Sequence, residues 1–292
     1  IIGVAVAILS AVSGIARGIR ILSELNVWLT IALALFVLAT GSTIFLLNAM
    51  VMDLGNYVTS LPQLSLETFA HTYPIEWMSS WTLFFWAWWI AWASFVGLFL
   101  ARISRGRTIR QFVAGTLTIP FIYIFVWISI FGNSAVNYVM TGGEAGAEFG
   151  QIAMNQPEQG FFTLLDQFPG FVIVGTIATA VGLLFYITSA DSGALVMGNL
   201  SSFLRTPADD ATPGVRIFWA LAIGLLTIGM LLVGGVPALQ NATIIMGLPF
   251  AFVLILVMYG LLKALRIEGY RADSQRYILP GRLSGRAFGD FH

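Results

Sequence analysis

The chain has 292 residues, of which 58% are hydrophobic and only 10% are charged, and its formal net charge is zero. A soluble domain carries roughly 25% charged residues, so this composition argues against a soluble globular protein. The absence of cysteine excludes disulfides and thiolate-bound metals. We expect a lipid bilayer as the surroundings and no nucleic-acid partner.

The first apolar segment, Ile1–Ser10, is too short to cross a bilayer, because a spanning helix needs about 20 apolar residues. No basic residue precedes it and no small-residue cleavage site follows it, so it does not resemble a signal peptide. We expect residues 1–13 to be the end of a truncated transmembrane helix. Residues 12–25 place apolar side chains around Arg17 and Arg20, which predicts an amphipathic helix on the inner membrane surface.

Six longer apolar runs follow, and their lack of period-two alternation favours helices over a barrel. The predicted spans are Val27–Asn48, Ser80–Ala101, Phe112–Phe131, Gly170–Leu204, Val215–Val233 and Ala242–Leu265. The last two are joined by a short turn around Gly234, Gly235 and Pro237. The connections 49–79 and 132–169 are longer than ordinary loops. Their semi-apolar stretches, such as Phe161–Phe168, predict short helices over the outer mouth, either as a cover or as a gate.

The basic residues divide the connections into two classes. All 14 lie in alternate connections, in the tail or at the span ends next to them: Arg17, Arg20, Arg102, Arg105, Arg107, Arg110, Arg205, Arg216, Lys263, Arg266, Arg271, Arg276, Arg282 and Arg286. The segments 49–79 and 132–169 contain acidic residues but no Lys or Arg. Cytoplasmic loops carry the excess of Lys and Arg, so this alternation predicts a multi-pass protein with a cytoplasmic C-terminus.

The second predicted span is unusually aromatic, with six of the nine tryptophans between residues 77 and 92. The first two suit a membrane interface. The other four lie ~8–18 Å further along a helix: Trp86, Trp88, Trp89 and Trp92. Helical spacing places Trp81, Trp88, Trp92, Phe95 and Phe99 on one face.

This aromatic stripe has two interpretations. Such a stripe commonly serves packing. It also suits a quaternary ammonium group, which has no proton to donate and is bound by cation–π attraction, most strongly by Trp. A cage of rings also avoids a bare carboxylate at membrane depth.

The run SWTLFFWAWW at Ser80–Trp89 closely resembles the signature of the betaine/choline/carnitine transporter family. The runs Ala101–Arg110 and Thr188–Ser192 also resemble that family, and the resemblance extends to about residue 275. The stretches most similar to its bacterial choline-transporter branch are Thr188–Leu195, Asn241–Phe250 and Arg266–Ser274.

The resemblance implies an all-α membrane protein with inverted five-helix repeats, here helices ~6 (end) to 12. Residues 14–79 would then form the inner-surface helix, one span and an outer loop. Residues 80–265 would form the second repeat with five spans, and residues 266–292 a cytoplasmic tail. Location in the bacterial inner membrane and a homotrimer are further implications. Most of the first repeat, with its part of the substrate site, would lie outside this chain.

By position, the resemblance assigns Trp88, Trp89 and Trp92 to substrate binding, and it places Phe95 and Phe99 further along the same pathway. With the neighbouring tryptophan, the candidate substrate-binding set is Trp86, Trp88, Trp89, Trp92 and Phe95. Ser94 stands where the family commonly has proline. A proline there would free a carbonyl and bend the helix, so local unwinding at this position stays open.

Residues 170–204 would form a helix of ~50 Å, which exceeds a ~30 Å hydrocarbon core. The helix must therefore tilt, project or break, and Thr188–Gly193 are the expected point of irregularity. Hydroxyls with freed carbonyls suit sodium, and the resemblance assigns Phe185, Thr188 and Ser189 to a sodium site. The alternative is that both hydroxyls bond back to their own helix.

Asp191 is the one acidic residue expected at membrane depth. An acid there is either a proton carrier or the structural partner of an arginine. The candidate ion-coupling set is therefore Phe99, Phe185, Thr188, Ser189 and Asp191.

The predicted function is secondary active import of a quaternary-ammonium compound for osmoprotection, first of all choline by proton symport. Sodium-coupled glycine betaine transport is the alternative, and a membrane-embedded ligand sensor is the alternative of another class. An enzyme is not expected, because the chain has only His71 and His292, no metal-ligand spacing and no acid pair within the spans. We expect no cofactor apart from the coupling ion, H⁺ or Na⁺.

Overall fold

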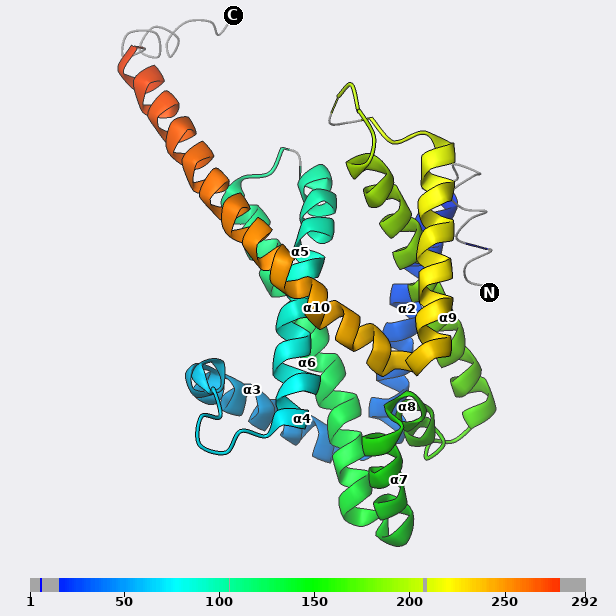
Figure 1. The fold of residues 1–292 in the computed structure, drawn as a ribbon. Helices are drawn as coiled ribbons and strands as arrows, with labels where there is room; N and C mark the ends of the chain where they lie inside the picture. Colours follow the sequence, from blue (N-terminus) through cyan, green and yellow to red (C-terminus); the bar gives the residue numbers. More distant parts are fainter. Residues whose placement is uncertain (1–5, 7–15, 105, 207–208, 279–292) are drawn as a thin grey trace, which may run out of the picture. The chain divides into compact units, whose positions relative to one another are not determined.

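A computed structural model describes residues 6, 16–104, 106–206 and 209–278, which are mostly helical and contain no strand. Figure 1 shows these helices in chain order. The chain divides into two compact units. One comprises Ile1–Thr72 and Phe99–Gly229, and the other comprises Tyr73–Leu98 and Met230–His292.

The first described helix of the first unit, α2, is Ala16–Thr40. It runs without interruption through the residues expected as a separate surface helix, of which 12–15 lie outside the described chain. The predicted span therefore continues that helix and ends at Thr40 rather than at Asn48. Gly41 closes the helix by donating its N–H to the carbonyl of Val37 at 3.0 Å. A Cβ at Gly41 would lie 2.8 Å from the same oxygen, so the chain turns where only glycine fits.

The segment expected as an outer loop forms a second long helix, α3, at Thr43–Leu66. Figure 1 shows α3 lying across α6 (Ile109–Thr141) rather than alongside it. Only Leu46 and Ala49 of α3 are buried. The connection over 49–79 is therefore helical to Leu66, and its helix is longer than the short one expected there. The sequence gives little indication of this helix, because its mean hydropathy of 1.3 is the lowest among the described helices that are long enough to span a membrane.

Helix α6 begins with a capping box, in which Thr108 Oγ1 accepts from the N–H of Gln111 and Gln111 Oε1 accepts from the N–H of Thr108, both at 3.2 Å. It continues to Thr141, well beyond the predicted end at Phe131. The following connection is also helical, with α7 at Gly143–Asn155 and α8 at Pro157–Leu165. The prediction of a short helix near Phe161–Phe168 is thus confirmed, although the helix begins and ends earlier.

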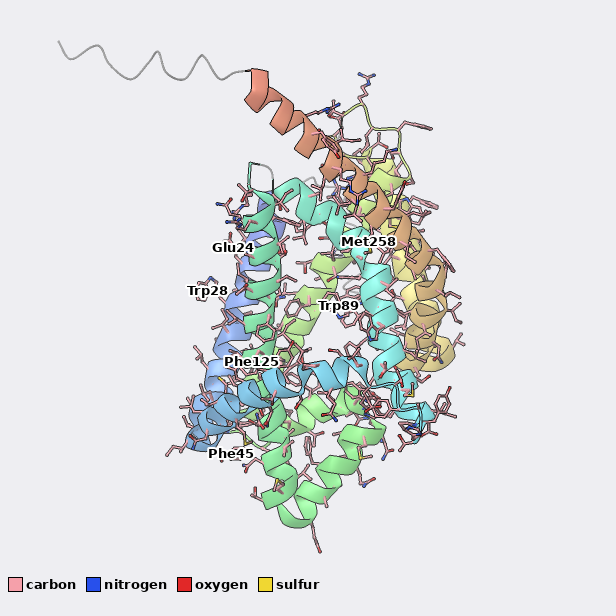
Figure 2. The ribbon with its side chains drawn as sticks, turned by 90° about the vertical axis from the view of Figure 1, so that its left-hand side faces the viewer. Glu24, Trp28, Phe45, Trp89, Phe125 and Met258 are labelled. Atoms are coloured by element: carbon pink, nitrogen blue, oxygen red, sulfur yellow. The ribbon has the colours of Figure 1, made fainter. Side chains whose placement is uncertain are left out.

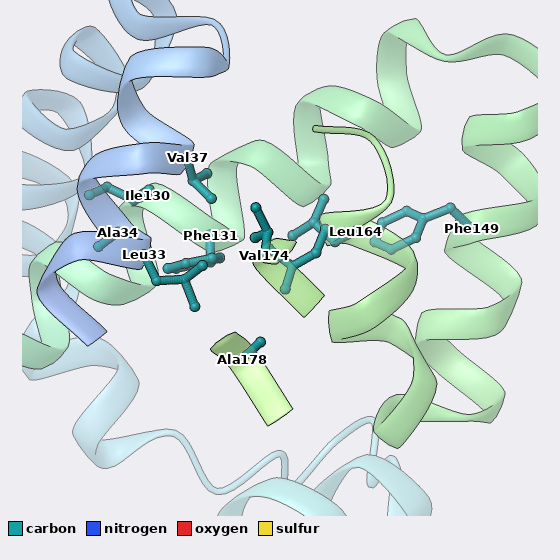
Figure 3. Packing of buried hydrophobic residues seen from close by; sticks show 10 residues of the cluster. Leu33, Ala34, Val37, Ile130, Phe131, Phe149, Leu164, Val174 and Ala178 are labelled. Carbon is teal, nitrogen blue, oxygen red and sulfur yellow. The ribbon is translucent and has the colours of Figure 1, made fainter. Parts of the chain in front are cut away.

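The core of the first unit lies where α2, α6, α7, α8 and α9 meet (Figure 3). Its buried residues are Leu33, Ala34, Val37, Ile130, Phe131, Phe149, Leu164, Leu165, Val174 and Ala178. Rings pack around it, with the centroids of Trp127 and Phe131 4.2 Å apart. Helices α7 and α8 are therefore anchored parts of this unit and not loose surface segments.

Helix α9 is continuous from Phe171 to Leu200. The irregularity expected at Thr188–Gly193 is absent, so that prediction is wrong. Its threonines bond back to their own helix: the hydroxyls of Thr176 and Thr179 donate to the carbonyls of Val172 and Gly175 at 2.6 and 2.8 Å. Such bonds satisfy the side-chain hydroxyl without breaking the helix.

The connection after α9 is fastened by polar contacts. The side chain of Asn199, which is buried, donates to Asp210 at 3.2 Å and accepts from the N–H of Ala211 at 2.7 Å. Trp219 Nε1 donates to Ser201 Oγ at 2.7 Å. The start of the next helix is therefore held against the end of α9.

The last helical segment, α10, is Pro213–Ile278, and it contains one residue with non-helical dihedrals, Gly235 (φ 64°, ψ −148°). This conformation is essentially restricted to glycine. The break confirms the predicted turn between two helices.

Several described helices are long and apolar enough to cross a membrane. Five such segments occur among the described residues: Ile21–Thr40, Thr43–Leu66, Ile109–Thr141, Phe171–Leu200 and Pro213–Arg271. The bent pair Ile75–Ala93 and Phe95–Ala101 is a sixth if it counts as one span. The prediction of an all-α membrane protein is confirmed.

Candidate functional site: an aromatic helix and a hydroxyl-bearing helix

The aromatic span begins with a short helix, α4 (Ile75–Trp77), followed by a π-helical turn at Met78–Leu83 and by α5 (Phe84–Ile103). A π-helical turn is rare and is frequent at functional sites. The helix bends by 43° between the segments Ile75–Ala93 and Phe95–Ala101. The bend falls at Ser94, so the backbone deviates there although proline is absent.

Side chains of this helix form a ladder of ring contacts within the second unit. Its members are Trp81, Phe84, Phe85, Trp88, Trp89, Trp92 and Phe95. Trp88 lies at the centre, with its centroid 6.1 Å from that of Trp89 and 6.3 Å from that of Trp92. Trp92 and Phe95 approach to 4.9 Å. The structure thus brings together four of the five predicted substrate-binding residues.

Trp86 is the exception. It is 65% exposed and makes none of the ring contacts found in the described chain. Its helical position points it away from the ladder, since two residues correspond to a 200° rotation from Trp88. Trp89 is also 58% exposed but contacts Trp88, and Figure 2 labels it on α5.

The back of the aromatic helix is held by a close approach of α10. A Cβ at Gly247 would lie 2.6 Å from Ala87 Cβ and 2.9 Å from Ala87 Cα. Ala87 is itself buried. Two small residues therefore bring the helices together, as is typical of membrane helices, and this contact fixes the face that carries the rings.

We expect Gly247→Leu to damage this contact. The new side chain meets backbone atoms of Ala87, so α5 and α10 must separate, at a cost of about 1–3 kcal/mol for overpacking. The measurement is the thermal stability of the purified protein, with Gly260→Leu on α10 as control because open space surrounds that Cβ position. Equal stability of the two variants would contradict the packing role of Gly247.

Phe185, Thr188 and Ser189 share one face of α9 in the first unit. Thr188 Oγ1 donates to the carbonyls of Leu184 and Phe185 at 2.9 and 3.1 Å. Phe185 and Ser189 are exposed, and Thr188 is half-buried. The hydroxyl oxygens keep lone pairs that face outward from the helix, but the unbroken helix frees no carbonyl.

Asp191 lies on another face of α9 and is only 4% exposed. Its Oδ1 lies 3.9 Å from the guanidinium nitrogen of Arg216, which belongs to the first turn of α10. Asp191 is thus buried beside Arg216, whereas Phe185 and Ser189 are exposed. Phe99, the remaining candidate, is exposed on α5 and belongs to the same unit as α9.

Comparison with known proteins identifies the family. The model of the betaine/carnitine/choline family transporters matches residues 1–270. The chain belongs to this family. Its members are transporters, which agrees with the expectation that the chain is not an enzyme.

Three relatives of this transporter chain illustrate the range of substrates in their names. It is 56% identical to the high-affinity choline transport protein of Escherichia coli over 94% of this chain and 40% of the relative. It is 54% identical to the osmo-dependent choline transporter BetT2 of Acinetobacter baylyi, with the same coverage of 94% and 40%. It is 37% identical to the glycine betaine transporter of Acinetobacter baylyi, over 92% of this chain and 40% of that protein. The chain thus spans about 40% of the length of these curated relatives.

Sequence reasoning missed three features of this transporter chain. The charge pattern places Arg216 at the inner end of a span and gives no sign of its pairing with Asp191, which depends on how α9 and α10 pack. Asp53 was read as an outer-loop acid, whereas it binds side chains of α6. Gly247 gave no signal, because an isolated glycine in an apolar run has many explanations.

Proposed function

We propose that the protein imports choline by secondary active transport and that the ring ladder of α5 forms one side of the choline site. The observation that carries this proposal is the ladder itself, with partly exposed faces on Trp88, Trp89 and Trp92. No acidic residue occurs between Glu76 and Glu144 in the sequence, so this helix offers rings and no carboxylate. Aromatic rings without an acid suit a charge that is spread over methyl groups.

Choline is favoured over glycine betaine by the relatives. The two relatives named for choline are 56% and 54% identical to the chain, whereas the one named for glycine betaine is 37% identical. Glycine betaine keeps the same trimethylammonium group, so the ladder alone does not distinguish the two compounds. A role in osmoprotection is supported by the name of the osmo-dependent relative.

We further propose that the coupling ion is a proton rather than sodium. The hydroxyl of Thr188 is already bonded to two carbonyls of its own helix, an arrangement that also occurs at Thr176 and Thr179. These bonds support a structural role for the hydroxyl. A sodium site would need Thr188 and Ser189 to act as ligands together with oxygens from elsewhere, since sodium prefers several oxygen ligands.

The test is uptake of labelled choline by cells that lack other choline carriers and express the intact transporter. We expect uptake to persist without sodium and to collapse with a proton uncoupler. We also expect the double variant Thr188→Val/Ser189→Ala to retain uptake within about fivefold, because a net hydrogen bond contributes only ~1 kcal/mol. Sodium-dependent uptake that this variant abolishes would instead support a sodium site and overturn proton coupling.

The orientation of the chain is proposed from its charges. All 14 basic residues lie in alternate connections, in the tail or at the span ends next to them, and 49–79 and 132–169 contain none. We place the C-terminus in the cytoplasm of a bacterial cell and α3, α7 and α8 on the outer side of the inner membrane.

A further inference from the structure

A cavity of about 510 Å³ lies between α3 and α6 in the first unit. It is lined by Asp53, Tyr57, Phe121, Ile124, Phe125, Ile128, Ser129, Gly132 and Asn133. Figure 2 labels Phe125 of this lining, on α6 near its crossing with α3. The volume falls within the range of small-ligand sites, ~300–1,000 Å³. No residue of the ring ladder lines this cavity, so its lining differs from that of the proposed choline site.

One end of the cavity carries a carboxylate in a fixed position. Asp53 Oδ2 accepts a hydrogen bond from Ser129 Oγ at 3.1 Å and another from Asn133 Nδ2 at 2.7 Å. Ser129 is only 3% exposed, and Asn133 is held further by donating to the carbonyl of Ser129 at 2.8 Å. Both donors bind the same oxygen, and Oδ1 accepts no hydrogen bond from the described residues.

Within the described part of the chain, no Lys or Arg forms a salt bridge with this carboxylate. None of the lining residues is basic, and the sequence contains no Lys or Arg between Arg20 and Arg102 or between Arg110 and Arg205. Both donors to Asp53 are neutral groups, which orient the carboxylate without neutralising it. The site therefore presents a negative charge to whatever enters the cavity.

The other end of the cavity is aromatic and apolar. The centroids of Tyr57 and Phe121 are 5.3 Å apart, and those of Phe121 and Phe125 are 6.0 Å apart. Ile124 and Ile128 are exposed beside them. Rings next to a carboxylate favour a cationic group, through cation–π attraction combined with ion pairing.

The polar and apolar ends of the cavity lie at different depths along α6, and these depths match those of a bilayer. Helix α6 has 33 residues and is therefore ~50 Å long, so a ~30 Å core centred on it extends over ~10–40 Å. Asn133 lies ~36 Å along the helix, near the edge of that core, whereas Phe121 and Phe125 lie ~18–24 Å along it, near the middle. With the core centred on α6, the charged end thus lies near the edge of the hydrocarbon core, within reach of a headgroup, and the apolar end lies at the level of acyl chains.

We propose that the cavity between α3 and α6 binds a phospholipid with an ammonium headgroup. The ammonium pairs with Asp53, the ring of Tyr57 one helical turn along α3 flanks it, and an acyl chain follows Phe121 and the apolar side chains of α6. A purely anionic lipid is disfavoured, because the cavity offers a carboxylate and no basic side chain. A free cation uses only the charged end and leaves the apolar end exposed.

The test uses native mass spectrometry of the intact, delipidated transporter. The protein is offered an equal mixture of phosphatidylethanolamine and phosphatidylglycerol with identical acyl chains, and the ratio of bound lipids is measured. In Asp53→Asn, an amide oxygen at the Oδ2 position keeps both hydrogen bonds, so the change removes charge and preserves shape. Glu67→Gln, at the end of the same helix and outside the cavity, is the matched control.

We expect the wild type and Glu67→Gln to prefer phosphatidylethanolamine, and Asp53→Asn to reduce that preference roughly threefold to tenfold, as for a partly exposed charge pair flanked by a ring. Unchanged thermal stability of Asp53→Asn shows that the variant is folded. An equal lipid ratio in Asp53→Asn and wild type, or a wild-type preference for phosphatidylglycerol, overturns the proposal.

A second arm separates a lipid from a free cation. Choline is added at high concentration to Trp89→Ala, in which the proposed choline site is impaired. Retention of bound phosphatidylethanolamine supports the lipid site. Displacement of that lipid by choline would show a site for free cations and would overturn the assignment to a lipid.

Discussion

Trp89→Ala should raise the KM for choline about 30-fold or more, while Trp86→Ala leaves it within about twofold. A desolvated cation–π contact contributes ~2 kcal/mol or more, which corresponds to roughly a 30-fold change in affinity. Trp89 contacts a single ring of the ladder, so its removal reports on the ligand more than on packing. Trp86 is a matched control, because it is the same residue type on the same helix and is similarly exposed but lies outside the ladder.

The measurement is the concentration dependence of choline uptake for both variants, with surface expression checked in parallel. Trp89→Phe should recover part of the lost affinity, since a benzene ring still presents a π face. Equal effects of Trp86→Ala and Trp89→Ala would contradict the assignment of the choline site to the ladder. An unchanged KM in Trp89→Ala would remove this residue from the site.

The second large effect concerns the buried pair of Asp191 and Arg216. Arg216→Gln should destabilise the protein strongly, because it removes a positive charge 3.9 Å from the buried carboxylate of Asp191. Loss of one partner from a buried ion pair costs about 3–5 kcal/mol. The pair is 3.9 Å apart and the arginine side chain is 16% exposed, so we expect a value near the lower end.

The double variant Asp191→Asn/Arg216→Gln separates a structural role from proton transport. It removes both charges, so most of the stability should return, as judged by thermal unfolding of the purified protein. We expect uncoupler-sensitive choline uptake to return with it, which agrees with a structural role for Asp191. A double variant that is folded but has lost proton-driven uptake would show that Asp191 takes part in coupling.

The membrane class and most spans were predictable from the sequence because continuous apolar runs and alternating basic loops are local signals. Helix α3 was not, because its hydropathy is low and its direction across α6 is set by tertiary packing. The early end of α2 depends on the tight turn at Gly41, which a hydropathy profile does not detect. The break at Gly235 was predictable because two glycines and a proline occur together there.

The sequence also predicted only part of the arrangement of the candidate site, because helical spacing reveals contacts within one helix but not how the backbone behaves around them. Helical periodicity correctly grouped Trp88, Trp92 and Phe95, since their contacts are local to one helix. Trp86 belongs to the candidate substrate-binding set only because it is a tryptophan, and its position on the helix points its side chain away from the ring ladder. The irregularity expected in α9 followed from its length and its hydroxyls, but hydroxyls that bond to carbonyls one turn earlier do not interrupt a helix.

The same back-bonding has a consequence for how these helices select their neighbours. A threonine whose hydroxyl is satisfied one turn earlier presents mainly its methyl group to the surroundings, so it resembles valine in a bilayer. Its polarity then gives little energetic reason to seek a partner helix or to avoid lipid. Partner choice depends instead on steric fit, as at Gly247 and Ala87, where the absence of side-chain volume decides which surfaces meet.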